Sequence, residues 1–160
     1  MFSIGDIIDL AVQIEENGEK FYRDAAKETA DPALVSMLQW LADEEVNHVE
    51  KFSEMRQEAQ ETVADPKIVD ISKALLQRSL GDQTFSLEDI DFSSLDQVET
   101  LLEWAIEFEK DTIVFYEMIK SFVQDKGTQD LLEAIIEEEL GHIRVLEEFL
   151  GDRASTNGKN

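Results

Sequence analysis

Residues 41–52 read LADEEVNHVEKF, and residues 135–146 read IIEEELGHIRVL. Each stretch holds a Glu-x-x-His motif, with Glu45 before His48 and Glu139 before His142. Residues three apart share one face of an α-helix, so each motif can present a carboxylate and an imidazole to the same metal ion. The chain has only these two histidines. Both stretches are therefore expected to be helices that carry metal ligands.

The sequence repeats itself at an offset of 94 residues. AVQIEENGEKFY (11–22) corresponds to AIEFEKDTIVFY (105–116), and the two Glu-x-x-His stretches correspond at the same offset. One pair of helices therefore recurs as a second pair. Two copies at so long a period are too few for a solenoid. We expect a bundle with pseudo-two-fold symmetry, in which equivalent residues of the two halves face each other at the centre.

The expected fold is an all-α four-helix bundle in one domain, residues 1–151. Apolar periodicity and helix-end signals predict helix pairs over 4–62 and 94–150. Between the second and third long helices lies a crossover, 63–93, with one shorter helix that ends near Gly81. A bundle with one long crossover is the natural packing for this order. The polar tail, 152–160, is expected to be disordered.

The predicted helix ends rest on a few capping residues. Ser3 with Asp6 has the pattern of a capping box, Asp31 is a candidate N-cap followed by Pro32, and Ser94 with Gln97 repeats the capping box. Gly127 is expected to end the third long helix and Gly151 the last one.

Composition limits the function further. The chain has 37 acidic and 14 basic residues and a net charge of −23, which repels phosphates and attracts metal cations. We therefore expect no nucleic-acid partner. The absence of cysteine excludes disulfides, iron–sulfur clusters, cysteine zinc sites and thiol catalysis in these residues. With no signal peptide and no run of about 18 apolar residues, the expected location is cytoplasmic, without a membrane.

The first and third long helices each add one inward glutamate. Glu15 interrupts the apolar stripe that contains Ile8 and Tyr22, and Glu109 interrupts the equivalent stripe that contains Tyr116. Burial of an unpaired carboxylate is costly. Two divalent cations would neutralise the four carboxylates. Glu and Glu-x-x-His groups on helices form the ligand set of di-iron and di-manganese bundles. The predicted metal ligands are Glu15, Glu45, His48, Glu109, Glu139 and His142.

On these motifs the sequence resembles the ferritin-like superfamily, and most closely its rubrerythrin-like branch, over about 4–55 and 98–150. The resemblance implies a centre of two iron ions, for which manganese is an alternative. It implies that Glu15 and Glu109 are the ligands from the helices without a histidine. It also implies that Glu45 and Glu139 bridge the ions, while each histidine completes one of them.

Two features depart from the rubrerythrin pattern. Rubrerythrins that reduce peroxide usually carry a cysteine-ligated rubredoxin iron, whereas this chain has no cysteine. We therefore expect a separate electron-donor protein. Rubrerythrins also carry another glutamate one turn after the ligand of the third helix, and that position is Thr112 here. The site is then closer to a symmetric set of four glutamates and two histidines.

The leading functional hypothesis is a di-iron oxidoreductase that reduces hydrogen peroxide or dioxygen. One alternative is a ferroxidase or iron-binding protein for detoxification or storage, and another is a metal-binding protein without catalysis. A homo-oligomer is expected, with a dimer favoured. The long crossover also permits two chains to exchange helix pairs.

Several residues near the predicted ligands have open roles. Tyr22 and Tyr116 are candidates for hydrogen bonds to ligands or for electron transfer, against ordinary packing in the core. Gly18 leaves room for an oxidant beside the metals or eases close helix packing. Glu44 and Glu138 are expected to face solvent.

Overall fold

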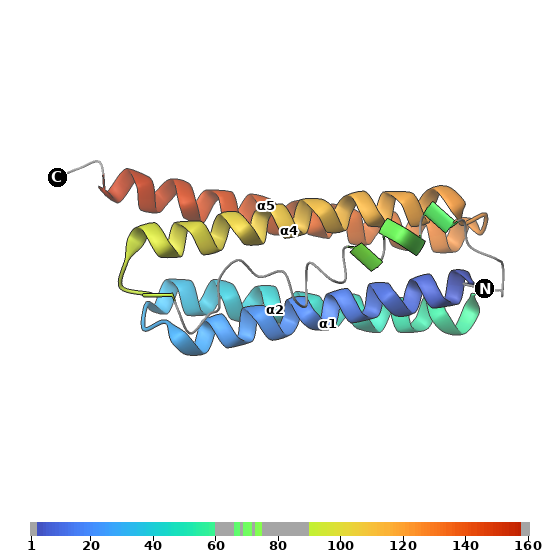
Figure 1. The fold of residues 1–160 in the computed structure, drawn as a ribbon, viewed down its shortest axis with the longest axis horizontal. Coiled ribbons are helices and arrows are strands. Elements are labelled where there is room, and N and C mark those ends of the chain that lie inside the picture. The colour runs from blue at the N-terminus through green and yellow to red at the C-terminus, as the bar shows by residue number, and fades with distance from the viewer. Residues whose placement is uncertain (1–2, 60–65, 68, 72, 75–89, 158–160) are drawn as a thin grey trace.

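Four long helices run side by side as two antiparallel pairs (Figure 1). They are α1 (Ile4–Glu28), α2 (Pro32–Glu58), α4 (Leu95–Phe122) and α5 (Lys126–Asn157). The computed structural model describes residues 3–59, 66–67, 69–71, 73–74 and 90–157. The two ends of the chain lie at opposite ends of the bundle (Figure 1). The predicted all-α four-helix bundle is confirmed for the described residues.

Two of the predicted N-caps form as expected. Ser3 and Asp6 make a capping box: the Ser3 amide donates to Asp6 Oδ2 at 2.7 Å, and the Asp6 amide donates to Ser3 Oγ at 3.1 Å. Asp31 caps α2 by accepting from the Ala33 amide at 3.0 Å, and Pro32 follows as the first helical residue. These contacts satisfy amides that the helix itself leaves unpaired.

The third predicted cap is correct in position but not in its contacts. Ser94 occupies the N-cap position of α4 but makes no side-chain capping hydrogen bond. The Gln97 side chain, which would complete a capping box, instead accepts from the Asp91 amide at 2.7 Å. A longer-range contact with the preceding turn has therefore replaced the local one.

The helix ends predicted at Gly127 and Gly151 are also wrong. The third long helix stops earlier, at Phe122, and Gly127 lies in the first turn of α5, where Asp125 Oδ2 accepts from the Thr128 amide at 2.8 Å. Gly151 lies inside α5 without a positive φ, so it does not provide the left-handed turn by which glycine ends a helix.

The crossover and the tail are described only in part. Residues 66–67, 69–71 and 73–74 are helical, and Val69 is buried against the core. The predicted end of this helix near Gly81 lies outside the described residues. The expectation of a disordered tail is wrong for residues 152–157, which continue α5, and residues 158–160 lie outside the described residues. The domain boundaries stay a prediction.

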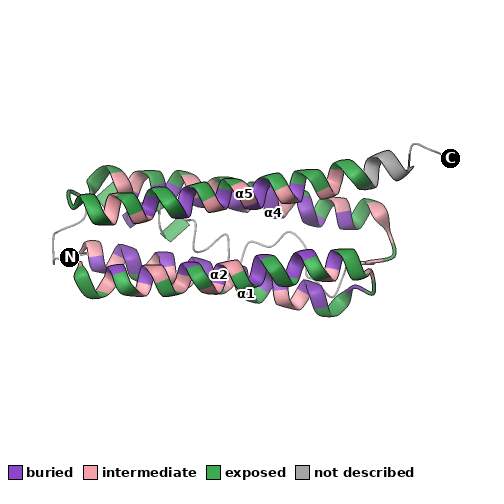
Figure 2. Cartoon of the chain, turned by 180° about the vertical axis from the view of Figure 1, so that it is seen from behind, coloured by how far each residue is buried: buried purple, intermediate pink, exposed green. Residues whose placement is uncertain are grey.

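The core consists of two apolar clusters with a buried polar layer between them. The buried faces of all four helices turn inward, and exposed residues cover the outside (Figure 2). One cluster includes Ile8, Phe52 and Phe115, and the other includes Leu38 and Leu102. Along every long helix the polar layer separates the residues of one cluster from those of the other.

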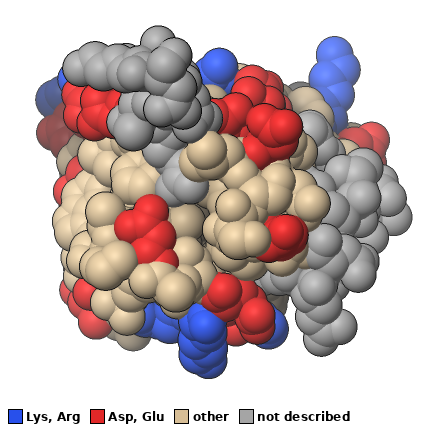
Figure 3. Space-filling model, turned by 90° about the vertical axis from the view of Figure 1, so that its left-hand side faces the viewer, with Lys and Arg blue, Asp and Glu red and all other residues tan. Residues whose placement is uncertain are grey.

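One end of the bundle combines uncharged and acidic surface. In the end view onto the turn between α1 and α2, acidic side chains lie around and within an uncharged surface (Figure 3). Among the described residues, no helix combines the length and the apolar character needed to cross a bilayer.

The caps predict a matched pair of stability effects. Replacement of Asp125 by Ala should lower the melting temperature by about 2–4 °C, because the Thr128 amide at the start of α5 loses its acceptor. Ser94→Ala should change it by less than 1 °C, because no capping bond is lost. Thermal unfolding followed by circular dichroism measures both. Equal losses in the two variants would contradict this assignment of caps.

Candidate metal centre

All four long helices contribute to the polar layer. The structure brings the six predicted ligands together there, and none of them is more than 2% exposed. Each helix without a histidine gives one carboxylate, and each Glu-x-x-His motif gives a carboxylate and an imidazole from adjacent turns. The contributions are Glu15 from α1, Glu45 and His48 from α2, Glu109 from α4, and Glu139 and His142 from α5.

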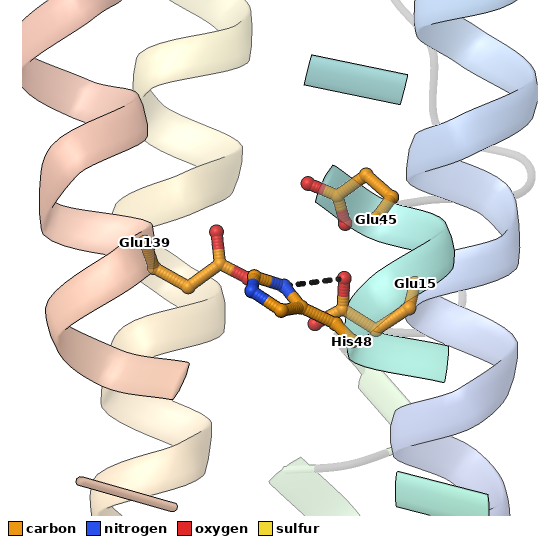
Figure 4. Close-up of side chains that lie close together, drawn as sticks. All are labelled: Glu15, Glu45, His48 and Glu139. Atoms are coloured by element: carbon orange, nitrogen blue, oxygen red, sulfur yellow. Dashed lines mark ion pairs between the residues drawn. The ribbon is translucent and has the colours of Figure 1, made fainter. Parts of the chain in front are cut away.

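The six side chains form two overlapping groups of four. Glu15 and His48 complete one group, Glu109 and His142 complete the other, and Glu45 and Glu139 belong to both. Within each group one ligand atom per residue lies within 4.8 Å of the others. Figure 4 shows the first group, with its side chains pointing toward one another from α1, α2 and α5. Such an arrangement can hold two ions that share two carboxylates.

Both imidazoles turn Nδ1 toward the carboxylates. His48 Nδ1 lies 3.0 Å from Glu139 Oε1 and 3.4 Å from Glu15 Oε2. His142 Nδ1 lies 2.9 Å from Glu139 Oε2 and 3.5 Å from Glu45 Oε1. The two rings stack with their centroids 5.5 Å apart. Nδ1 is therefore the atom of each histidine that is placed to bind an ion.

Several buried polar atoms of this layer have no hydrogen-bond partner, although buried polar groups in folded proteins nearly always have one. These atoms are Glu15 Oε2, Glu45 Oε1, His48 Nδ1, both Glu139 oxygens, and His142 Nδ1 and Nε2. All except His142 Nε2 face the shared centre of the two groups or belong to the shared carboxylates. The residues present therefore fit a pair of metal ions.

The contacts of the four buried carboxylates divide them into two kinds. Burial and then the negative charges of Glu15 and Glu139 raise the pKa of Glu45 well above its ordinary value. Glu139 behaves alike, because burial and the charges of Glu109 and Glu15 raise its pKa well above the ordinary value. Burial would also raise the pKa of Glu15, but contacts with Glu45 and His48 lower it to about 2. The pKa of Glu109 is lowered in the same way, by Glu139 and His142 against the effect of burial.

Both histidines hold protons strongly when no metal is bound. Burial would lower the pKa of His48, but contacts with Glu139 and Glu15 raise it to about 12. For His142, Glu109 and Glu139 overcome burial and raise the pKa to about 10. These directions favour charged Glu15 and Glu109 opposite two charged imidazoles, and they favour the protonated form of Glu45 and Glu139. Without metal, bound protons therefore offset the negative charge of the layer. In the loaded site, metal cations would offset it.

The two predicted tyrosines contact carboxylates of the opposite half. The Tyr22 hydroxyl donates to Glu109 Oε1 at 2.7 Å, and the Tyr116 hydroxyl donates to Glu15. Burial, with the charge of the neighbouring carboxylate, raises the pKa of both phenols well above the ordinary value. Both hydroxyls therefore keep the proton that they donate. A role for them in electron transfer stays a prediction.

Glu138 faces solvent only in part, because 38% of its side chain is exposed and the rest is in contact with the protein. Its Oε2 lies 2.8 Å from His48 Nε2, and Lys51 Nζ donates to both of its oxygens at 3.0 Å. In the other half, Glu44 Oε2 lies 4.0 Å from His142 Nε2. The signal for these residues was present in the sequence, because Glu44 and Glu138 are themselves related by the offset of 94.

The sequence profile of the rubrerythrin family matches residues 6–150. The chain belongs to the rubrerythrin family. Membership agrees with the Glu and His groups above, which have the composition of a site for metal ions. The roles of the six rubrerythrin-type ligands stay predictions.

Solved structures show the same fold. A crystal structure from Thermotoga maritima, described as a ferritin-like diiron-carboxylate protein, is 25% identical with a TM-score of 0.66, and the match covers 93% of this chain and 95% of that one. A hypothetical protein from Pyrococcus furiosus is 17% identical with a TM-score of 0.66, over 96% of this chain and 92% of that one. No curated protein is detectably similar in sequence.

Metal binding should release protons. We expect two divalent ions to displace about four protons per chain at pH 7, because both shared carboxylates and both imidazoles must lose theirs. Affinity should consequently fall as the pH falls. Addition of Zn²⁺ to the metal-free protein in weak buffer with a pH indicator measures the release. Release of less than one proton per chain would contradict the protonation pattern derived above.

Proposed function

We propose that this protein is a di-iron oxidoreductase that reduces hydrogen peroxide or dioxygen. The observation that supports this best is the pair of four-residue groups that share Glu45 and Glu139. Two ferrous ions held there would supply the two electrons that, with two protons, convert hydrogen peroxide to two molecules of water. The carboxylate-rich ligand set with one imidazole per ion suits iron or manganese, and we propose iron.

The chain's own residues would hold the ligands in place and exclude water. The apolar clusters above and below the layer keep bulk water away from it. Tyr22 and Tyr116 fix Glu109 and Glu15 by hydrogen bonds from the opposite half. Ligands that are held in this way need little rearrangement during a reaction.

A small hollow beside Gly18 supports a small oxidant as the substrate. It has a volume of about 10 Å³, which is room for roughly one water molecule. The hollow is lined by Asn17, Gly18, Phe21, Tyr22, Trp104 and Phe108. A Cβ atom on Gly18 would lie 3.1 Å from Glu45 Oε2, so the missing side chain keeps space next to a shared carboxylate.

The proposal includes a separate electron-donor protein that restores the ferrous state, and a homo-oligomer, with a dimer favoured. The absence of cysteine in these 160 residues supports an outside source of electrons. Assays of single turnover need no donor, because the ferrous protein carries the electrons for one reaction.

The reaction can be tested with two Fe²⁺ per chain, loaded without oxygen and mixed with equal concentrations of H₂O₂ or O₂. We expect the absorbance of ferric iron to appear within seconds, and peroxide to be the faster oxidant. The variant Glu45→Ala/Glu139→Ala should lose this reaction, because neither group of four keeps its shared ligands. No oxidation by either oxidant would refute the proposal, and rapid oxidation by O₂ with slow oxidation by peroxide would favour a ferroxidase.

Gly18 allows a sharper test of access. Gly18→Ala should slow oxidation about tenfold, because the new methyl group presses on Glu45 and narrows the hollow. Gly141→Ala is the matched control on α5, since its Cβ would meet nothing within 4 Å. Stopped-flow absorbance measures both rates, and metal content after dialysis shows whether the ions are retained. Equal rates in the two variants would contradict a role for the hollow.

A further inference from the structure

The two halves of the site differ in what lies behind each histidine. His48 Nε2 lies 2.8 Å from Glu138 Oε2, which is hydrogen-bond distance. The equivalent atom, His142 Nε2, lies 4.0 Å from Glu44 Oε2 and has no hydrogen-bond partner although it is buried. The repeat therefore places a carboxylate near Nε2 of each histidine, but only the carboxylate of Glu138 lies within hydrogen-bond distance.

Lys51, which lies one turn after His48 on α2, explains the difference between the two histidines. Lys51 Nζ donates to both oxygens of Glu138 at 3.0 Å and holds this carboxylate against His48. The residue that corresponds to Lys51 at the offset of 94 is Val145, which cannot form an ion pair. Glu44 instead accepts from the side-chain amide of Asn47 on its own helix, at 3.4 Å.

An aromatic ring takes the place beside His142. The indole of Trp40 lies edge-on to the His142 ring, with the centroids 5.5 Å apart. The corresponding residue of the other half is Ala134, which has no ring. His142 is therefore packed by an apolar group, whereas His48 is oriented by a charged hydrogen bond.

We propose that Lys51 and Glu138 are positioning residues that make the two metal positions unequal, so that a divalent ion binds first and more tightly at His48. When an ion displaces the Nδ1 proton of His48, the contact with Glu138 holds the other hydrogen on Nε2 and keeps the freed Nδ1 lone pair facing Glu139 and Glu15. Loss of such an outer contact typically costs 10–100-fold in metal affinity. The negative charge of Glu44 also favours a cation, but at a longer distance and without orienting the ring.

This inference rests on the metal-binding part of the proposed function and not on the reaction with an oxidant. The probe is Co²⁺, added without oxygen to the metal-free protein and followed by calorimetry and visible absorbance. We expect two binding steps whose dissociation constants differ by at least about tenfold. Two equal steps would overturn the inference and leave the proposed function intact. Failure to bind any Co²⁺, Mn²⁺ or Fe²⁺ would overturn both.

Matched substitutions identify which step belongs to which half. Glu138→Gln and Lys51→Val should each weaken the first step about tenfold and leave the second within about twofold. Glu44→Gln, the symmetric control, should leave the first step unchanged. Because these side chains are partly exposed, melting temperatures should stay close to that of the unaltered protein, which separates positioning from a loss of folding. A first step that responds to Glu44→Gln and not to Glu138→Gln would overturn the assignment.

The reciprocal change gives an independent check. Val145→Lys places an ammonium group where it can hold Glu44 against His142, as Lys51 holds Glu138. The second step should then tighten, and the two dissociation constants should approach each other. A crystal with one Zn²⁺ per chain should show the ion at His48. An ion at His142 instead would overturn the order of binding.

Discussion

Six ionisable side chains buried between two apolar clusters are the constraint on which the rest of this bundle depends. Charges removed from water are costly unless partners compensate them. In the metal-free layer the pKa shifts favour proton uptake by Glu45 and Glu139 and charged imidazoles opposite Glu15 and Glu109. The apolar clusters on either side of the layer stabilise the fold by burying apolar surface, which offsets the cost of burying the ionisable side chains. The six side chains therefore affect the stability of the fold as well as the chemistry of the site.

The centre exists only where the two halves of the repeat meet. Tyr22 of the first half donates to Glu109 of the second, and Tyr116 of the second donates to Glu15 of the first. His48 likewise contacts Glu139 from the opposite helix pair. Neither pair of helices holds a complete set of ligands. The complete set of ligands therefore requires that the two halves dock against each other.

The two halves of the site differ at positions where the repeat is not exact. Gly18 leaves a hollow beside Glu45, whereas its counterpart Thr112 is buried and donates its hydroxyl to the Phe108 carbonyl at 2.9 Å. Lys51 reaches across to the opposite helix pair, and Val145 cannot. The repeat supplies the ligands, and these unmatched positions decide how each ion is reached and how firmly its histidine is held.

The sequence by itself determined the helical bundle and the six side chains at its centre, because the offset of 94 and the 3.6-residue period are both visible along the chain. It did not determine the α4 cap, where Gln97 contacts Asp91, nor the contact of Glu138 with His48. Those contacts join a helix to the preceding turn or to a helix of the other pair, so they depend on how these elements pack. Only the tertiary structure decided that one outer carboxylate lies at 2.8 Å and its twin at 4.0 Å, because a lysine from the neighbouring helix holds the first.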